Sequence, residues 1–176
     1  PLVLKPCDDG SSVDLRVCAT AADAERARAD LHRRRPVLLA ESFIEGREVT
    51  IGLLEDRELP LIEVRPKCGL YDYEAKYNRD DTQYVLEPAL PEGLAETIRR
   101  QARAAWRRLG LRDVARMDFM IDHRGAWFLE ANTMPGFTDH SLVPKAAAHA
   151  GLPMERLVRQ LAEQALRRAA QTATGA

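Results

Sequence analysis

Four polar residues interrupt two strongly β-forming runs between residues 115 and 132, where packed strands should carry apolar side chains. The runs are ARMDFMID and AWFLEAN, and they are joined by HRG. Side chains alternate between the two faces of a strand, so Arg116 and Asp118 share one face of the first run, and Glu130 and Asn132 share one face of the second. If HRG is a three-residue hairpin loop, Asp118 lies opposite Glu130 and Arg116 lies opposite Asn132. The spacing therefore predicts a hairpin that gathers these four side chains on one face.

The chemistry that this set could perform is metal binding. Two carboxylates directly opposite each other destabilise a sheet, and a cation removes the repulsion. Mg²⁺ prefers oxygen ligands and is commonly held by one or two carboxylates together with substrate phosphates. Asp118, Glu130 and the amide oxygen of Asn132 supply that set, and Arg116 could neutralise an oxyanion. The alternative is a partly solvated sheet face on which Arg116 bridges the acids. The segment NTMPG, which follows at once, favours metal binding because a Pro-Gly loop brings backbone N–H groups to the same place.

Two segments near the N-terminus are suited to a nucleotide. KPCDDGSSV places Lys5 before a Gly-Ser loop whose backbone and hydroxyl donors can surround phosphate oxygens, although the loop lacks the GK[ST] ending of a Walker motif. The alternative is an ordinary turn. ESFIEGREVT holds Glu41, Glu45 and Glu48, and a carboxylate there could bind ribose hydroxyls. The alternative is that these acids are simply solvated.

A third segment, YDYEAKYN, lies inside a long polar stretch over residues 67–89, which we expect to be irregular. Tyr71, Tyr73 and Tyr77 surround Lys76 in it. Aromatic residues gathered in a polar loop are typical of a lid that closes over a ligand. The alternative is an ordinary surface loop with a few packed rings.

The elements that must position these segments can be predicted from periodicity. We expect strands in LVL, VLLAESF, EVTIGLLE and LPLIEV, and helices over residues 21–34, 91–109, 142–150 and from 153 onward. Thr20 is placed to cap the first helix, with Asp23 near the capping-box position. Hairpins dominate over strict strand–helix alternation, so the pattern predicts an α+β fold on a largely antiparallel sheet.

Composition narrows the class of protein. The chain has 176 residues, 45% hydrophobic and 30% charged, which fits a globular unit of one domain or two small ones. The formal net charge of −1 argues against nucleic acid as a partner, and no apolar stretch is long enough to span a membrane. The three cysteines lack metal-ligand spacing, and we expect a reduced, cytoplasmic location. The chain opens on PLVLKP without an initiating Met, from which we expect a fragment.

Together these segments resemble the C-terminal part of the D-alanine–D-alanine ligases, which belong to the ATP-grasp superfamily. The matching segments are KPCDDGSSV, ESFIEGREVT, YDYEAKYN, RMDFMID and FLEANTMPGFTDHSLVP, in this order between residue 1 and about residue 167. The resemblance implies an ATP-grasp fold without its N-terminal substrate domain. Residues 1–40 would be the remainder of the central subdomain, residues 41–170 the C-terminal subdomain, and residues 171–176 a disordered tail.

The resemblance implies a reaction and its partners. ATP would phosphorylate the carboxylate of one D-alanine, and the amine of a second would attack the acyl phosphate, giving D-alanyl-D-alanine for peptidoglycan synthesis. The family is commonly dimeric, so a homodimer is expected, with no nucleic acid or membrane partner. The open alternatives are an ATP-grasp ligase with another acceptor, and a nucleotide-binding module without catalysis.

The resemblance also implies ligands for ATP and metal. Two Mg²⁺ or Mn²⁺ ions are expected at Asp118, Glu130 and Asn132. Lys5 and Lys76 would contact the phosphates. Adenine would be surrounded by Glu41, the backbone at Phe43 and Ile44, and Met120. Glu48 would meet the ribose.

The remaining roles that the resemblance implies are catalytic. Arg116 and the backbone N–H of Gly136 would stabilise the developing oxyanion, and Ser141 would bind the carboxylate of the second D-alanine. Ser11 and Tyr77 would belong to the hydrogen-bonded set that closes the lid. One departure concerns the phosphate loop: Asp14 stands where a glycine is common after SSV.

Overall fold

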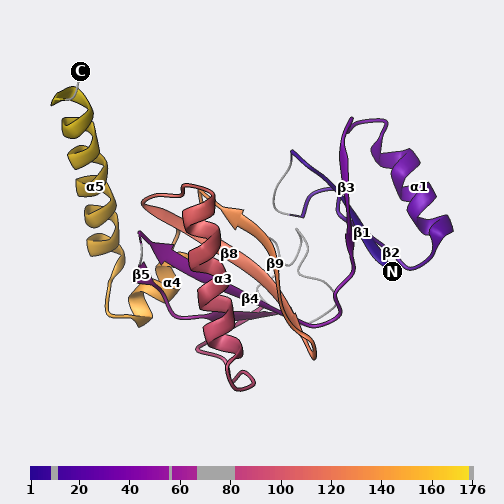
Figure 1. The fold of residues 1–176 in the computed structure, drawn as a ribbon, viewed down its shortest axis with the longest axis horizontal. Helices are drawn as coiled ribbons and strands as arrows, with labels where there is room; N and C mark the ends of the chain where they lie inside the picture. The colour runs from indigo at the N-terminus through magenta and orange to yellow at the C-terminus, as the bar shows by residue number, and fades with distance from the viewer. Residues whose placement is uncertain (9–11, 56, 67–81, 175–176) are drawn as a thin grey trace. The chain divides into compact units, whose positions relative to one another are not determined.

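The computed structural model describes residues 1–8, 12–55, 57–66 and 82–174 (Figure 1). The chain divides into two compact units. The first comprises Pro1–Glu45 and Arg65–Gln83, and the second comprises Gly46–Val64 and Tyr84–Ala176. Each unit has its own sheet and its own hydrophobic cluster, so each is described by itself.

The first unit contains a three-stranded sheet in the order β2-β1-β3, with both pairings antiparallel. Helix α1 packs on this sheet, and the shared cluster is built from Leu4, Cys18 and Leu31, all buried. The short strand β2 is an element that the sequence pattern did not predict. The elements are β1 (Leu2–Pro6), β2 (Arg16–Cys18), α1 (Ala21–Leu31) and β3 (Leu38–Ser42).

Helix α1 begins where the sequence predicts, because its first turn is capped. The side chain of Thr20 accepts a hydrogen bond from the backbone N–H of Asp23, and the carboxylate of Asp23 accepts one from the backbone N–H of Thr20. This reciprocal capping box satisfies two N–H groups that a helix start leaves without partners. The hydrogen bond from the Thr20 side chain also lowers the pKa of the Asp23 carboxyl.

The second unit contains a six-stranded sheet in the order β7-β6-β4-β8-β9, with β5 paired to β4. The pairings of β4 with β5, β6 and β8, and of β8 with β9, are all antiparallel. The predicted α+β class with a largely antiparallel sheet is therefore confirmed. The strands are β4 (Arg47–Leu54), β5 (Arg57–Glu58), β6 (Ile62–Arg65), β7 (Gln83–Leu86), β8 (Val114–Asp122) and β9 (Gly125–Asn132).

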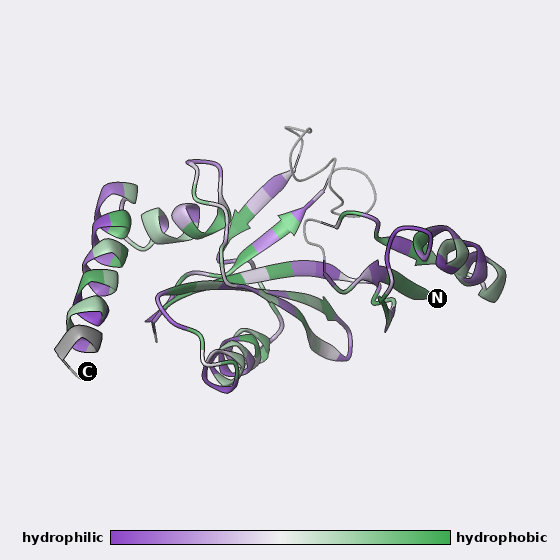
Figure 2. Ribbon diagram, turned by 90° about the horizontal axis from the view of Figure 1, so that it is seen from above, coloured by the Kyte–Doolittle hydropathy of each residue, from purple (hydrophilic) through white to green (hydrophobic). Residues whose placement is uncertain are grey.

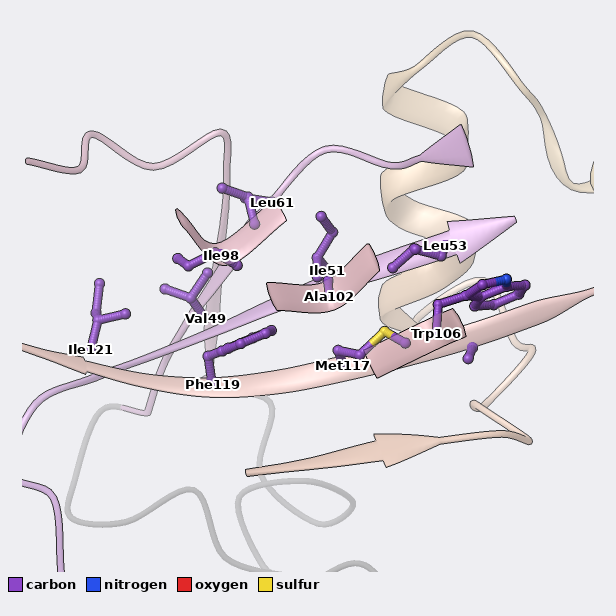
Figure 3. Packing of buried hydrophobic residues seen from close by; sticks show 11 residues of the cluster. Val49, Ile51, Leu53, Leu61, Ile98, Ala102, Trp106, Met117, Phe119 and Ile121 are labelled. Atoms are coloured by element: carbon purple, nitrogen blue, oxygen red, sulfur yellow. The ribbon is translucent and has the colours of Figure 1, made fainter. Parts of the chain in front are cut away.

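One face of this sheet packs against helix α3 (Leu94–Arg108). The helix presents Ile98, Ala102 and Trp106, spaced four residues apart, to the sheet (Figure 3). The facing side chains alternate along the two central strands, so every second residue belongs to this core. They are Val49, Ile51 and Leu53 from β4, and Met117, Phe119 and Ile121 from β8. Burying each large side chain of this kind contributes about 1.5–3 kcal/mol. The core therefore stabilises the two strands whose other face carries the polar residues.

The β8–β9 hairpin differs from the prediction at its tip. The predicted three-residue loop is wrong: Asp122 pairs with Gly125, so the turn holds two residues. A β-bulge between Asp118 and Phe119 then leaves Leu129 as an extra residue on β9, because Asp118 pairs with Glu130 while Phe119 pairs with Phe128. The turn has one residue fewer than predicted and the strand has one residue more, so the two differences cancel. Asp118 therefore lies opposite Glu130, and Arg116 opposite Asn132, as the sequence predicts.

Two further helices follow the hairpin: α4 (Leu142–His149) and α5 (Met154–Thr174). Hydrophilic and hydrophobic residues both occur along α3 and α5 (Figure 2). The disordered tail expected over residues 171–176 is wrong for residues 171–174, because α5 continues through them. The sequence there, QTAT, follows two alanines, which favour helix. Residues 175–176 lie outside the described part of the chain.

The expected irregular stretch over residues 67–89 is also wrong at its end, where Gln83–Leu86 form β7 at the edge of the sheet. Tyr84, Val85 and Leu86 are β-forming residues, and pairing with β6 outweighs the polar composition of the surrounding segment. Within the described residues, none of the helices combines the length and the apolar character needed to cross a membrane.

Candidate functional site

The face of the second sheet that points away from α3 carries the predicted polar set. Arg116 and Asp118 extend from β8, Glu130 and Asn132 extend from β9, and Thr50 extends from β4 directly opposite Asp118. Alternation places these side chains on one face, since the residues between them on β4 and β8 belong to the core. The structure therefore brings together all four residues that the sequence placed on one face, and adds a fifth.

Asp118 is the centre of this cluster and is only 5% exposed. Its Oδ1 accepts hydrogen bonds from Arg116 Nε at 2.8 Å and from Thr50 Oγ1 at 2.7 Å. Its Oδ2 accepts from Arg116 Nη2 at 2.8 Å and from Asn132 Nδ2 at 2.9 Å. Four donors thus match the roughly four acceptor positions of a carboxylate, and the two-pronged contact with arginine is the strongest kind. The carboxylate is consequently fixed in orientation before any ligand arrives.

Glu130 is the exposed member of the cluster. Among the described residues its one hydrogen bond comes from Asn132 Nδ2, at 3.4 Å. Arg116 balances the charge of Asp118, so the charged groups of this cluster, one positive and two negative, leave a surplus of one negative charge within it. A surplus negative charge beside oxygen ligands attracts a cation.

The donor set fits a hard divalent cation. Asp118 and Glu130 supply carboxylate oxygens, and Asn132 lies between them with its NH₂ group directed at both. That NH₂ group takes the place where a cation would be attracted, and rotation of the amide would present its carbonyl oxygen instead. Within the described residues no group of three or more His, Cys, Asp or Glu side chains is arranged to hold a metal, so any ion here depends on the Asn132 amide, on water or on substrate oxygens.

The loop after β9 brings Gly136 and Ser141 together. A Cβ on Gly136 would lie 2.9 Å from Ser141 Oγ, so only glycine allows this close approach. Ser141 is the N-cap residue of α4, and its Oγ accepts a hydrogen bond from the backbone N–H of Thr138 at 3.0 Å. The hydroxyl of Thr138 also lies 3.0 Å from Ser141 Oγ. Thr138 was not among the predicted site residues; its position three residues before Ser141, in TDHS, is the signal for such a turn.

In the first unit, Lys5 and Glu41 contact each other. They extend from neighbouring strands, β1 and β3, and Lys5 Nζ lies 2.7 Å from Glu41 Oε2. The pair is partly exposed, with side-chain exposures of 20% and 31%. Just beyond β3, the backbone N–H of Phe43 donates to the carbonyl oxygen of Pro1 at 3.2 Å, and Ile44 is half-buried.

The two remaining expected nucleotide contacts in the second unit, Glu48 and Met120, are cross-strand neighbours on β4 and β8. They lie on the same face as Asp118, two residues further along each strand. The glycine before this strand has a steric reason, because a Cβ on Gly46 would lie 2.1 Å from the carbonyl oxygen of Ile121. The predicted lid residues Lys76 and Tyr77 lie outside the described residues.

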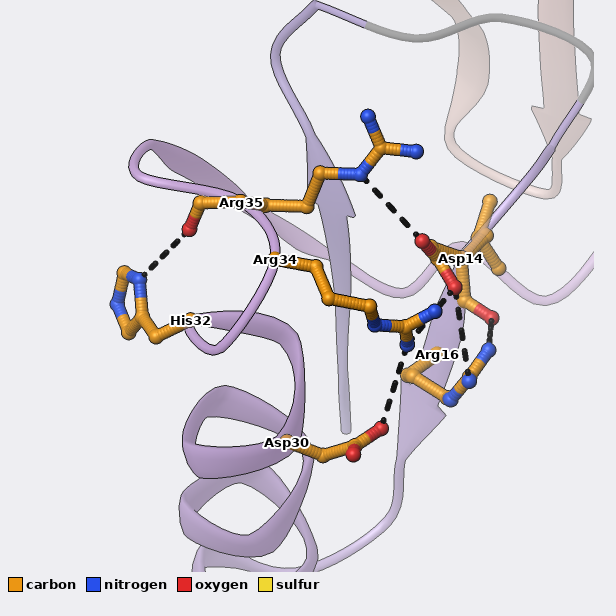
Figure 4. A network of polar contacts seen from close by, with 7 residues as sticks. Asp14, Arg16, Asp30, His32, Arg34 and Arg35 are labelled. Carbon is orange, nitrogen blue, oxygen red and sulfur yellow. Dashed lines mark hydrogen bonds and ion pairs between the residues drawn. The ribbon is translucent and has the colours of Figure 1, made fainter.

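The same holds for Ser11 in the phosphate loop, but the turn after it is described. Ser12 and Asp14 both have φ of +58°, in the left-handed region that favours glycine. This explains why a glycine suits position 14. Three arginines surround the Asp14 carboxylate: Arg34 at 3.2 Å, Arg35 at 3.4 Å and Arg16 at 3.9 Å (Figure 4).

The tip of the hairpin holds another aspartate with a defined environment. Asp122 Oδ1 accepts hydrogen bonds from the Trp127 indole N–H at 3.0 Å and from the backbone N–H of Arg124 at 2.8 Å. The indole N–H first, and then the backbone and guanidinium of Arg124, hold the pKa of the Asp122 carboxyl far below its usual range. The Arg124 guanidinium also lies over the Trp127 ring, 5.0 Å from its centre. Asp122 is thus committed to the turn.

Comparison with known proteins agrees with this arrangement. The family described as D-ala D-ala ligase C-terminus matches residues 1–163. A D-alanine–D-alanine ligase from Dechloromonas aromatica is 43% identical over 94% of this chain and 55% of its own length, and one from Bordetella avium is 44% identical over 89% and 51%. The crystal structure of the D-alanine–D-alanine ligase from Bacillus anthracis matches with a TM-score of 0.84 and 30% identity, over 98% of this chain and 56% of that one.

The fold is therefore the ATP-grasp fold, as the sequence resemblance implies. The chain belongs to the D-ala D-ala ligase C-terminus family. It spans about half the length of the relatives that it matches.

Proposed function

We propose that this chain supplies the nucleotide-binding and metal-binding part of an ATP-dependent ligase that joins two D-alanines and forms ADP. One observation carries the proposal: Arg116, Asp118, Glu130 and Asn132 converge on one sheet face with a surplus negative charge. The relatives with this family assignment are D-alanine–D-alanine ligases, and one solved structure, from Bacillus anthracis, is a complex with ATP. We further propose that residues 1–40 are the remainder of the central subdomain and that residues 41–170 are the C-terminal subdomain.

Asp118, Glu130 and Asn132 would hold Mg²⁺ or Mn²⁺, and two such ions would neutralise charge on the phosphate oxygens of ATP. The chain's own contribution is to fix the ligands. Asp118 is held by four hydrogen bonds. Glu130, being exposed, remains free to move toward an ion. Arg116 would then stabilise an oxyanion that develops beside the metal.

The other expected contacts divide between the units. In the first, Lys5 would contact phosphate, and Glu41, with the backbone at Phe43 and Ile44, would contact adenine. Because Lys5 and Glu41 are paired at 2.7 Å, nucleotide binding would exchange one salt bridge for two ligand contacts. In the second, Glu48 would meet the ribose.

Three further residues of the second unit would complete the site. Met120 would line the adenine pocket beside Glu48, its neighbour on the adjacent strand. The Gly136 N–H would join Arg116 at the oxyanion, and Ser141 would bind a carboxylate of the second substrate. Lys76, Tyr77 and Ser11 keep the roles that the family resemblance implies. We also retain a cytoplasmic location and a homodimer as predictions.

The proposal is tested first by binding. Isothermal titration of Mg·ATP into the 176-residue chain should give saturable binding, and Asp118→Asn should weaken it by at least about tenfold, the usual effect of disturbing a metal ligand's environment. Asp122→Asn is the matched control, since it also removes a carboxylate from β8. Asp122 lies on the same face as Asp118 but at the turn, away from the proposed metal. Equal losses in both variants, or no loss in Asp118→Asn, would contradict the assignment of the metal.

Turnover separates the candidate activities. Phosphate release should be measured with ATP and D-alanine, with D-alanine replaced by other amino acids or D-lactate as the acceptor. Release with D-alanine supports the ligase proposal, and release only with another acceptor favours a related ATP-grasp ligase. Mg·ATP binding without release for any acceptor favours a nucleotide-binding module.

A further inference from the structure

Thr50 is a buried hydroxyl on the central strand of the site sheet, and the functional assignments above give it no role. It is 2% exposed and lies opposite Asp118 in the β4–β8 register. Its Oγ1 lies 2.7 Å from Asp118 Oδ1 and 3.1 Å from the carbonyl oxygen of Met117. A hydroxyl has one proton to donate. The shorter contact, to a charged acceptor, takes it, because charge-assisted hydrogen bonds are the stronger ones.

The presence of a hydroxyl at this position needs a reason. The strand EVTIGLL is otherwise apolar from Val49 to Leu54, and valine has the same shape as threonine with higher affinity for a buried site. Burying a hydroxyl without a hydrogen-bond acceptor is unfavourable. The hydroxyl therefore needs an acceptor, and Asp118 Oδ1 is the nearer and the charged one of the two within reach.

We propose that Thr50 is a positioning residue for the metal-binding carboxylate of Asp118; this rests on the function proposed above. Thr50 holds Oδ1 from β4, while Arg116 holds both oxygens from β8 itself. With Oδ1 fixed by two donors, the Oδ2 edge is directed toward Asn132 and the Glu130 side of the face. Without the Thr50 contact only Arg116 and Asn132 hold the carboxylate, so its rotation about the Cβ–Cγ bond is less restricted and Oδ2 is less firmly directed. Loss of such supporting contacts typically weakens metal affinity about 10–100-fold.

The experiment uses two matched pairs that differ by one hydroxyl. Thr50→Val replaces the hydroxyl by a methyl group of the same shape and is compared with the wild-type chain. Thr50→Ala is compared with Thr50→Ser, since both lack the methyl group. Mn²⁺ is titrated into each ¹⁵N-labelled chain, and the broadening of the Asn132 side-chain amide signal gives an apparent affinity at the site itself. Far-UV circular dichroism and thermal unfolding establish the folded fraction of each variant.

We expect Thr50→Val to bind Mn²⁺ about tenfold or more weakly than wild type, and Thr50→Ala to bind about tenfold more weakly than Thr50→Ser. Thr50→Ser should stay within about twofold of wild type, because it keeps the donor. If Thr50→Val does not fold, the Ala–Ser pair decides alone. Unchanged Mn²⁺ affinity in folded Thr50→Val or Thr50→Ala would overturn the proposal and reduce Thr50 to a structural hydrogen bond.

Asp118→Asn separates this inference from the proposed function. If Asp118→Asn loses the Mn²⁺ effect at Asn132 while the Thr50 variants keep it, the metal site stands and the positioning role falls. If Asp118→Asn leaves the effect unchanged, the ion does not use Asp118, and both proposals fail together.

Discussion

Asp118 and Asp14 are both aspartates that face arginine, but their surroundings differ in charge and in exposure. Asp118 accepts hydrogen bonds from one arginine, one threonine and one side-chain amide. It lies on a sheet face beside a second carboxylate. Asp14 lies in a turn and faces Arg16, Arg34 and Arg35, of which Arg34 also pairs with Asp30 at 3.7 Å. The hairpin face carries one negative charge in excess, whereas the Asp14 cluster carries positive charge in excess.

This difference distinguishes the proposed ligand site from a group of ion pairs at a backbone turn. The arginines around Asp14 have side-chain exposures from 26% to 54%, so water screens them and each pair is weak. Asp14 itself is a non-glycine residue at φ of +58°. On the hairpin face, a buried and fully hydrogen-bonded Asp118 stands beside an exposed Glu130. A cation site is thus indicated by unbalanced charge beside fixed ligands, and the number of acids alone would not distinguish the two regions.

The largest expected effect comes from removing the surplus charge. Glu130→Gln leaves Arg116 and Asp118 balanced, so the face no longer attracts a cation. Mg·ATP affinity of the chain, measured by titration calorimetry, should fall about 10–100-fold, and turnover of a ligase that contains the chain should fall by orders of magnitude. The unfolding temperature should hardly change, because Glu130 is exposed. Normal Mg·ATP affinity in this variant would remove the distinction drawn between the two aspartates.

The next effect comes from raising the surplus charge. Asn132→Asp places a third carboxylate beside Asp118 and Glu130, and the NH₂ group that now bonds both is lost. We expect the unfolding free energy without metal to fall by about 1–3 kcal/mol, and millimolar Mg²⁺ to restore much of it. Thermal unfolding with and without Mg²⁺ measures this. Thr133→Asp, at the exposed next position, is the control and should show no Mg²⁺-dependent recovery.

A smaller effect is expected at Asp14. Asp14→Ala keeps a side chain in the left-handed conformation and removes the partner of three arginines, which should lower the unfolding free energy by about 1–2 kcal/mol. Asp14→Gly removes the same contacts but also the strain, so it should be less destabilising by about 1 kcal/mol. Chemical denaturation of both variants gives the comparison. Equal stabilities of the Ala and Gly variants would show that the left-handed backbone at position 14 carries no strain.

The smallest effect is expected at Asp122, where Trp127→Phe removes the indole donor and keeps the ring. The pKa of the Asp122 carboxyl should rise toward its ordinary value of about 4. A titration of the carboxyl ¹³C NMR signal between about pH 1 and pH 6 would measure this shift. Because the folded pKa is depressed, its stabilising contribution is present above the unfolded pKa and is lost as pH falls. Stability should therefore decline less steeply below about pH 4 in Trp127→Phe than in wild type. An identical acid response would assign the pKa shift to Arg124 alone.

Much of the hairpin face could be predicted from sequence because alternation along a strand is a local rule. It fixes which side chains share a face, and the capping box of α1 is equally local. The turn length and the compensating bulge depend on how both strands pack on the core, and no short pattern reveals them. The arginines at Asp14 were missed for the same reason, since Arg34 and Arg35 lie about twenty residues away in sequence.

Thr50 was missed for a different reason. Threonine is a common strand residue, so a single one in EVTIGLL predicts a strand and nothing more. Its meaning depends on the neighbour across β4 and β8, which only the pairing register identifies. Strand β2 was missed because three residues are too few to show a period, and β7 because polar neighbours hide it.

The extra residue Leu129 shifts the pairing register of the hairpin by one residue between its tip and its base. If all residues of β9 paired regularly from the turn onward, without a bulge, Leu129 would lie opposite Asp118, and Glu130 would lie opposite Met117 on the core face. Deleting this single leucine should therefore restore a regular ladder from the turn onward and leave Glu130 opposite Asp118. The carboxylates can thus meet at two different lengths of β9, one with the bulge and one without it, so a strand that loses this leucine through evolution or design would still carry the acidic pair.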